Sequence, residues 1–185
     1  MSHEPNTISF NDGAAYERYM GVWSRLAGRE FLAWLSPSRG LRWLDVGCGN
    51  AYGTALMAKS AASITGLDYD AGTVADNQKR YSAIGNLSFR QGTVPPLPFG
   101  DASFDVVTAF QFIEHIGARK EFLRECLRVL RPGGKLLVTT PNVKKSLARN
   151  PFHVHEYTFD EMRREVSDLT GAFELKGLNG NERVN

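Results

Sequence analysis

The sequence LDVGCGNAYGT, residues 44–54, decides the fold. Its glycines, Gly47, Gly49 and Gly53, follow a short apolar run that predicts a β-strand and precede a segment with helical spacing. Glycine can adopt a positive φ in a tight turn, and its missing Cβ lets a ligand approach the backbone. A strand, a glycine loop and a helix in this order are typical of nucleoside-binding α/β domains, although an ordinary strand-to-helix turn can contain the same glycines.

Asp68 completes the nucleoside-binding pattern. It lies nineteen residues after Gly49, at the end of the apolar run SITGLD, where a carboxylate can accept two hydrogen bonds from a ribose diol. Together with the glycine loop this spacing predicts a nucleoside site, whereas an isolated Asp68 would indicate only a turn. Because we expect it to border an open cleft, we also expect Asp68 to have few partners in the ligand-free protein.

Strands and helices alternate along the rest of the sequence. Apolar or β-branched runs predict strands at 42–47, 63–68, 87–92, 104–110 and 135–140. Helical spacing predicts helices at 54–60, 71–82, 118–130 and 159–167. Pro132, Gly133 and Gly134 should end the third of these helices. Repeated strand–helix–strand units need right-handed crossovers, so we expect a doubly wound α/β fold with a parallel sheet.

Both ends of the chain extend this pattern. In the first forty residues, aromatic and apolar side chains recur at helical steps, at Tyr16, Tyr19, Trp23, Leu26, Phe31 and Trp34. We therefore expect one compact domain, with an N-terminal helical cap at 1–40 and a cofactor-binding part at 41–185. A last strand is expected at 173–178, and the C-terminal edge of the sheet is expected to be incomplete because no edge hairpin follows in the sequence.

Composition excludes several classes of partner. The 22 Lys and Arg residues nearly balance the 20 Asp and Glu residues, and a net charge of +2 is too small to indicate nucleic acid or an anionic membrane surface. The sequence has neither a signal-peptide pattern nor an apolar run that could cross a bilayer. Cys48 and Cys126 lack metal-type spacing, so we expect a reduced, cytoplasmic protein. The oligomeric state is left open.

Asp45 helps to identify the nucleoside. It precedes Gly47 by two positions and places a carboxylate under the loop, which favours a cationic ammonium or sulfonium ligand over a pyrophosphate. A short-chain dehydrogenase would need a Tyr-x-x-x-Lys pair, and no tyrosine in this sequence has a lysine four residues later. A nucleotide-dependent oxidoreductase therefore lacks its reacting residue.

Four stretches carry a specific resemblance. They are WLDVGCGNAYGT (43–54), ITGLDYD (64–70), RQGTVPPLPFGDASFDVVTAFQFIEHI (90–116) and LRVLRPGGKLLVTTPN (127–142). In this order they resemble the successive motifs of class I S-adenosylmethionine-dependent methyltransferases. The most similar subgroup is that of small-molecule methyltransferases, including the O-methyltransferases of quinone biosynthesis. The resemblance implies a Rossmann-like sheet of seven strands and S-adenosylmethionine as the cofactor.

The resemblance also implies a role for each cofactor-binding residue. Four residues would surround the methionine part of the cofactor: Asp45, Gly47, Cys48 and Gly49. Asp68 would hold the ribose and Tyr69 would lie against the adenine, whose edge would meet Gly92, Thr93 and Val94. Phe110 and Gln111 would line the reacting side. In the capping helix, Tyr19 would cover the cofactor and Arg25 would pair with its carboxylate, although a simple amphipathic helix with a solvated Arg25 fits equally well.

Two residues depart from the family's pattern. Ala51 stands where the third loop glycine is usual, and its methyl group could narrow the loop. Thr93 stands where an aspartate often contacts the adenine amino group, although its hydroxyl can still accept a hydrogen bond. Both departures concern affinity for the cofactor more than its identity.

A second set of residues concerns the acceptor. His115 could take a proton from a phenol or an alcohol as a catalytic base, with a structural histidine as the commoner alternative. His153 and His155 favour an acceptor loop, with a polar surface turn as the alternative. Related sequences with Glu-x-x-Glu-His at this point bind a divalent metal, but Gln111 replaces the first carboxylate here, so we expect no metal.

These observations lead to one function and one alternative. We expect a methyltransferase that uses S-adenosylmethionine to methylate an unidentified small molecule, on oxygen. The alternative is a methyltransferase-like module that binds the cofactor or a partner without turnover. The acceptor itself cannot be identified, because variable loops rather than the cofactor motifs select it.

Overall fold

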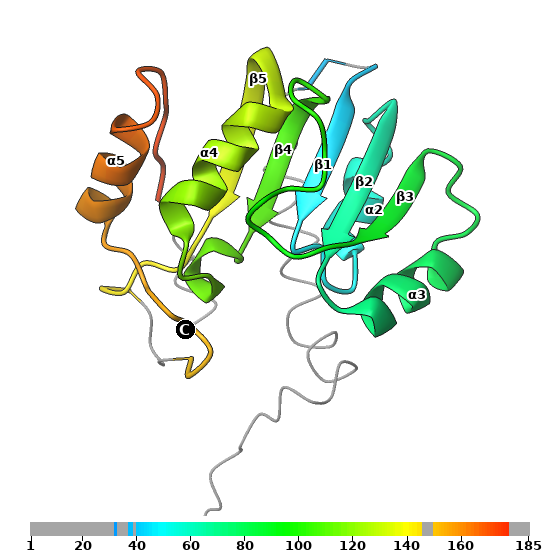
Figure 1. Ribbon diagram of the computed structural model, residues 1–185, viewed down its shortest axis with the longest axis horizontal. Coiled ribbons are helices and arrows are strands. Elements are labelled where there is room, and N and C mark those ends of the chain that lie inside the picture. The colour runs from blue at the N-terminus through cyan, green and yellow to red at the C-terminus, as the bar shows by residue number, and fades with distance from the viewer. Residues whose placement is uncertain (1–31, 33–36, 39, 146–149, 178–185) are drawn as a thin grey trace, which may run out of the picture.

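The structure is a computed structural model that describes residues 32, 37–38, 40–145 and 150–177 (Figure 1). Most of the expected N-terminal cap, including Tyr19 and Arg25, lies outside the described residues. Within them the chain forms an α/β domain, and none of its helices is long and apolar enough to cross a membrane.

A parallel sheet of five strands forms the centre of the domain. The strands are β1 (Arg42–Val46), β2 (Ser63–Asp68), β3 (Leu87–Gln91), β4 (Phe104–Phe110) and β5 (Leu130–Thr139). Their order in the sheet is β3-β2-β1-β4-β5, and each neighbouring pair is parallel. The chain therefore moves outward from β1 in one direction and then returns to build β4 and β5 on the other side. This reversal between β1 and β4 is the topological switch point at which doubly wound sheets bind ligands.

Helices cover both faces of this sheet. They are α2 (Tyr52–Met57), α3 (Ala71–Arg80), α4 (Arg119–Val129) and α5 (Phe159–Ser167), with a short 3-10 turn, η1 (Ile113–His115), after β4. In Figure 1, α4 lies in front of the sheet and α2 lies behind it. Side chains alternate along β1 in the same way, since Leu44 packs in the cluster that contains Phe122 of α4, and Trp43 packs in the cluster that contains Met57 of α2. The expected doubly wound architecture is confirmed.

The start of β5 differs from its predicted position. The sequence places this strand at 135–140, but it already begins at Leu130, and the stretch around Pro132 belongs to it. The register with β4 shifts between Phe104 and Val106, so this part of the ladder is irregular. Proline has no N–H to donate and is tolerated at such an irregularity, which explains why it ends the helix without delaying the strand.

The predicted strand at 173–178 is wrong for its described part, because residues 172–177 adopt no regular structure. A strand needs a neighbour for its backbone hydrogen bonds, and among the described residues β5 pairs with β4 alone. Phe173 is correspondingly exposed. The described sheet thus has five strands rather than seven, and its edge at β5 is open, as the sequence led us to expect.

Candidate functional site

A cleft lies at the carboxyl ends of the strands, on both sides of the switch point. Its volume is about 260 Å³, and it is lined by Val46, Gly47, Leu67, Asp68, Tyr69, Gly92, Thr93, Val94, Phe112, His115 and Ile116. These residues end or follow four different strands, β1 to β4, whose carboxyl ends meet at this edge because the strands are parallel. The cleft brings together seven of the residues that the sequence singled out for the cofactor and the acceptor.

The glycine loop borders this cleft in a conformation that depends on glycine. Gly47 has a φ of +70° and Gly49 a φ of +49°. A Cβ on Gly47 would overlap the ring of Phe112, whereas the corresponding position on Gly49 faces open space. The amides of Gly47 and Cys48 donate to the Leu67 carbonyl at 2.8 and 3.1 Å, which fastens the loop to β2. The loop therefore presents bare backbone at the end of β1.

Ala51 takes the left-handed conformation that the usual glycine would adopt freely. Its φ is 61° and its ψ is 24°, at the N-terminal end of α2. A residue with a Cβ pays about 1–2 kcal/mol for this conformation, so the departure from glycine is a strain on the loop. The Ala51 side chain is buried rather than directed into the cleft. It therefore does not narrow the space for a ligand.

Asp68 is more firmly held than the sequence suggested. The Gly49 amide donates to its Oδ2 at 2.9 Å, and the Asp70 amide donates to its Oδ1 at 3.1 Å. The expectation of few partners in the ligand-free protein is therefore wrong, because the carboxylate ties the glycine loop to the end of β2. Each carboxylate oxygen still has a second lone pair, so Asp68 can hold the loop and accept hydrogen bonds from a ligand at the same time.

Asp45 lies beneath the loop and does not line the cleft. The hydroxyl of Thr54 donates to its Oδ2 at 2.6 Å, and the hydroxyl of Thr108 donates to its Oδ1 at 2.7 Å. The pKa of Asp45 is raised from 3.8 to about 6, mainly because the carboxyl is buried; the two hydroxyls lower it, and the nearby charge of Asp68 raises it. With this pKa most of the Asp45 carboxyl is ionised at pH 7 and above, and its charge favours a cation nearby.

Cys48 lies beneath the loop as well. A Cβ on Gly66 of β2 would come within 3.0 Å of the Cys48 Sγ and still nearer to the ring of Phe89. Burial raises the pKa of the Cys48 thiol well above its usual range, and the charges of Asp45 and Asp68 raise it further. Cys48 is therefore a neutral packing residue at physiological pH, and its side chain does not line the cleft.

The expected adenine-binding residues gather on the β2–β3 side of the cleft. Tyr69 is 72% exposed, so its ring is free to lie against a ligand. The Gly92 amide donates to the Asp68 carbonyl at 2.9 Å, and a Cβ on Gly92 would come within 3.2 Å of Leu67. The backbone at Gly92 therefore lies directly against the end of β2, and together with Thr93 it forms this wall of the cleft.

Phe110 and Gln111 lie outside the described cleft. Phe110 packs against the cluster that contains Trp43, on the face of the sheet that α2 covers. Gln111 is turned to Thr139 of β5, and its backbone amide donates to the Thr139 carbonyl at 2.9 Å. Phe112 lines the cleft instead, and sequence reasoning missed it. Phe110, Gln111 and Phe112 follow one another at the end of β4. The positive φ of 51° at Gln111 interrupts the regular alternation of side chains between the two faces of the sheet, which the prediction assumed.

The end of the cleft where an acceptor is expected is formed by η1 and a loop that crosses it. The His115 Nδ1 lies 3.0 Å from the Phe152 carbonyl oxygen, and the rings of His115 and His153 meet edge to face with centroids 4.8 Å apart. The Glu114 carbonyl accepts hydrogen bonds from the amides of Val154 and His155. His153 is thereby brought beside the cleft, while the ring of His155 packs against Tyr157.

Comparison with known proteins adds the family. The family model described as a methyltransferase domain matches residues 44–138. A probable S-adenosylmethionine-dependent methyltransferase of Mycolicibacterium smegmatis is 41% identical over 175 residues, a match that covers 88% of this chain and 64% of that protein. A ubiquinone biosynthesis O-methyltransferase of Azorhizobium caulinodans is 34% identical over 109 residues, covering 58% of this chain and 43% of that protein.

The fold has a counterpart among solved structures. The crystal structure of a SAM-dependent methyltransferase from Aquifex aeolicus matches with a TM-score of 0.69 at 19% identity, and the match covers 78% of this chain and 81% of that one. At this identity the likeness concerns the fold alone. The matched part of each of the two curated relatives is less than two thirds of its length.

Proposed function

Because the chain belongs to the methyltransferase domain family of S-adenosylmethionine-dependent enzymes, we propose that it transfers a methyl group to an oxygen of a small-molecule acceptor. The single observation that carries this proposal is the cleft at the switch point, where the Asp68 carboxylate on one side and the His115 imidazole on the other border one space. The similarity to an O-methyltransferase of ubiquinone biosynthesis supports oxygen as the methylated atom.

The residues of the cleft fit this cofactor. The bare backbone at Gly47 and Gly49 leaves room for the methionine part, and the buried carboxylate of Asp45 lies beneath that loop to favour a cation. Asp68 keeps free lone pairs for the ribose hydroxyls. When bound, S-adenosylmethionine supplies a methyl group on a positively charged sulfur, which needs no further activation. The protein then contributes mainly alignment of the two reactants.

His115 is the proposed catalytic residue. The Phe152 carbonyl can only accept a hydrogen bond, so Nδ1 of His115 carries the hydrogen and Nε2 carries the lone pair. The imidazole is therefore held in the tautomer whose Nε2 can act on the hydroxyl of an acceptor. In the simplest route, Nε2 accepts the proton that the hydroxyl loses as its oxygen gains the methyl group.

The proposal is tested by binding and by turnover of the same protein. S-adenosylhomocysteine should raise the melting temperature, because it binds the native state alone, while NAD and ATP should not. With S-adenosylmethionine labelled in its methyl group, the label should appear in one or more phenols or alcohols of an acceptor panel. An equal thermal shift with NAD would overturn the cofactor assignment. Binding of S-adenosylhomocysteine without label transfer to any acceptor would instead favour the alternative, a methyltransferase-like module without turnover.

Asp45 provides a prediction with opposite signs for stability and binding. Its folded pKa of about 6 exceeds the ordinary 3.8, so the stability that this group contributes is present below pH 4 and is lost as the pH rises to 6. The Asp45→Asn variant should escape this loss and be more stable than the wild type by about 2 kcal/mol at pH 8 without cofactor. Its affinity for S-adenosylmethionine should fall severalfold, because the counter-charge is missing.

Chemical denaturation at pH 4 and pH 8, with calorimetric titration of the cofactor at pH 8, measures both effects. Thr54→Val is a matched control, since it removes one hydrogen bond to Asp45 but keeps the charge. A variant Asp45→Asn that is less stable at pH 8 and binds the cofactor as the wild type does would contradict the assignment of Asp45 to the cofactor.

A further inference from the structure

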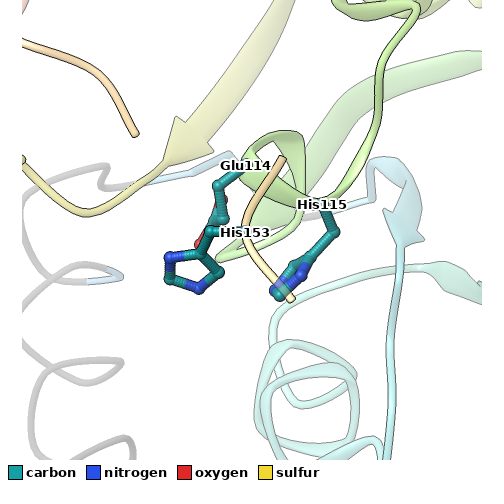
Figure 2. A group of neighbouring side chains, drawn as sticks. All are labelled: Glu114, His115 and His153. Atoms are coloured by element: carbon teal, nitrogen blue, oxygen red, sulfur yellow. The ribbon is translucent and has the colours of Figure 1, made fainter. Parts of the chain in front are cut away.

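Three potential metal ligands meet at the acceptor side of the cleft. One ligand atom from each of Glu114, His115 and His153 lies within 4.8 Å of the other two. Figure 2 shows the three side chains side by side, Glu114 and His115 from η1 and His153 from the loop that crosses it. The sequence separates His153 from the other two by almost forty residues, so the fold alone brings the set together.

The Glu114 side chain has no partner that would explain its position. It is fully buried, and neither carboxylate oxygen has a hydrogen-bond partner among the described residues. Burial raises the pKa of the Glu114 carboxyl; the nearby Thr140 hydroxyl, which lowers it, lies outside hydrogen-bonding geometry. A buried carboxylate without partners costs several kcal/mol unless it is neutral or faces a cation. The imidazoles of His115 and His153 lie beside this carboxylate.

Both imidazoles are oriented as metal ligands usually are. Nδ1 of His115 faces the Phe152 carbonyl, and Nδ1 of His153 lies 2.7 Å from Oε1 of Glu156. In metal sites, the ring nitrogen that does not bind the ion typically donates to a carbonyl or a carboxylate in this way, which fixes the tautomer and increases the basicity of the ligand. In each ring Nε2 is thus the nitrogen left for another bond.

The loop that carries His153 is held in place by the backbone. The amides of Val154 and His155 donate to the Glu114 carbonyl at 2.8 and 3.2 Å. These bonds do not involve the three side chains of the cluster, so the ligands are brought together before any ion binds. Preorganisation of this kind lowers the cost of binding.

From this arrangement we infer that Glu114, His115 and His153 bind one divalent ion of the zinc type. Two imidazole nitrogens and one carboxylate suit Zn²⁺, Co²⁺ or Ni²⁺, whereas Mg²⁺ prefers oxygen ligands throughout. The sequence led us to expect no metal, because Gln111 replaces a carboxylate. Gln111 is turned away to Thr139, and His153 supplies the third ligand from elsewhere in the chain.

Three protein ligands would leave a coordination position open, and His115, one of the three, lines the cleft. An acceptor hydroxyl bound there would have a lowered pKa and would lose its proton to water. Zinc binding and proton acceptance both use the Nε2 lone pair of His115, so in the metal-bound protein His115 is a ligand and the ion replaces it in activating the hydroxyl. Only this last step rests on the proposed function; the binding of the ion does not.

The test is a titration of the metal-free full chain with Co²⁺, followed by its visible absorption. The wild type should bind one Co²⁺ per chain, Zn²⁺ should displace it, and millimolar Mg²⁺ should not. Affinity should fall at least a hundredfold in His153→Ala and about 10–100-fold in Glu156→Gln, which removes only the orienting carboxylate. His155→Ala is the matched control from the same loop and should bind Co²⁺ as the wild type does.

Glu114→Gln separates a ligand from a structural residue. As a ligand, Glu114 should be dispensable for folding, so the metal-free variant should melt at or above the wild-type temperature while its Co²⁺ affinity falls at least tenfold. Equal Co²⁺ binding by the wild type and His153→Ala, or Mg²⁺ binding tighter than Zn²⁺, would overturn the inference. Methyl transfer that persists in a wild type that does not bind Co²⁺ would overturn the metal site and leave the proposed function standing.

Discussion

Replacing Gly47 by alanine should abolish measurable binding of S-adenosylhomocysteine and lower the free energy of unfolding by about 2–5 kcal/mol. Two costs add at this position. A residue with a Cβ is strained at a φ of +70°, and that Cβ would overlap the ring of Phe112. Phe112 cannot easily move away, because its ring packs against that of Phe122, a fully buried residue of the core, with centroids 5.3 Å apart.

Gly53→Ala is the matched control for this substitution. Gly53 lies in α2, has an ordinary φ, and a Cβ there meets open space. The same change should therefore leave affinity unchanged and raise stability by up to about 1 kcal/mol, since alanine is the better helix former. Urea denaturation and calorimetric titration of both variants measure the difference. If Gly47→Ala bound the cofactor as tightly as Gly53→Ala, the glycine loop would not border the cofactor.

Asp68→Ala should weaken cofactor binding between tenfold and a few hundredfold, because two charge-assisted hydrogen bonds to the ribose are worth about 1.5–3 kcal/mol each and do not add fully. The ligand-free variant should also lose about 1–3 kcal/mol of stability, since the Gly49 and Asp70 amides lose their acceptor. A fall in affinity is therefore accompanied by a fall in stability, and the second effect must be measured separately by thermal or chemical denaturation.

Asp70→Ala is the control for the structural part of this effect. Asp70 accepts a hydrogen bond from the Thr73 amide at 2.7 Å and begins α3, so its loss should cost about 1 kcal/mol of stability. It lies outside the residues that line the cleft, and its affinity for the cofactor should be unchanged. A loss of affinity in Asp70→Ala equal to that in Asp68→Ala would mean that damage to the loop, and not a lost ribose contact, weakens binding.

Local patterns in the sequence predicted most of the sheet and the position of the cleft beside β1 and β2. Short apolar runs correctly placed β1 to β4, and a glycine loop with an acidic residue after the next strand correctly indicated where the ends of β1 and β2 meet. Parallel strands bring their carboxyl ends to one edge of the sheet, so residues that end successive strands in the sequence become neighbours at that edge. This is why Gly47, Asp68 and Gly92 lie together as predicted.

Contacts between distant segments could not be predicted in this way. The partners of Asp68 depend on the exact course of the loop, and the shift from Phe110 to Phe112 depends on one positive φ at Gln111. His153 reaches His115 only because backbone hydrogen bonds fasten its loop to η1. None of these features has a periodic pattern, so the sequence gives no local indication of them.

A double-mutant cycle with a modified ligand tests most directly whether the ribose of the cofactor lies on Asp68. Calorimetric titration would compare S-adenosylhomocysteine with its 2′-deoxy analogue on the wild type and on Asp68→Ala. If the ribose lies on Asp68, removing its 2′-hydroxyl should weaken binding to the wild type about tenfold or more but scarcely change binding to the variant, because the two changes remove the same hydrogen bond. An equal loss in both proteins would contradict this placement of the ribose.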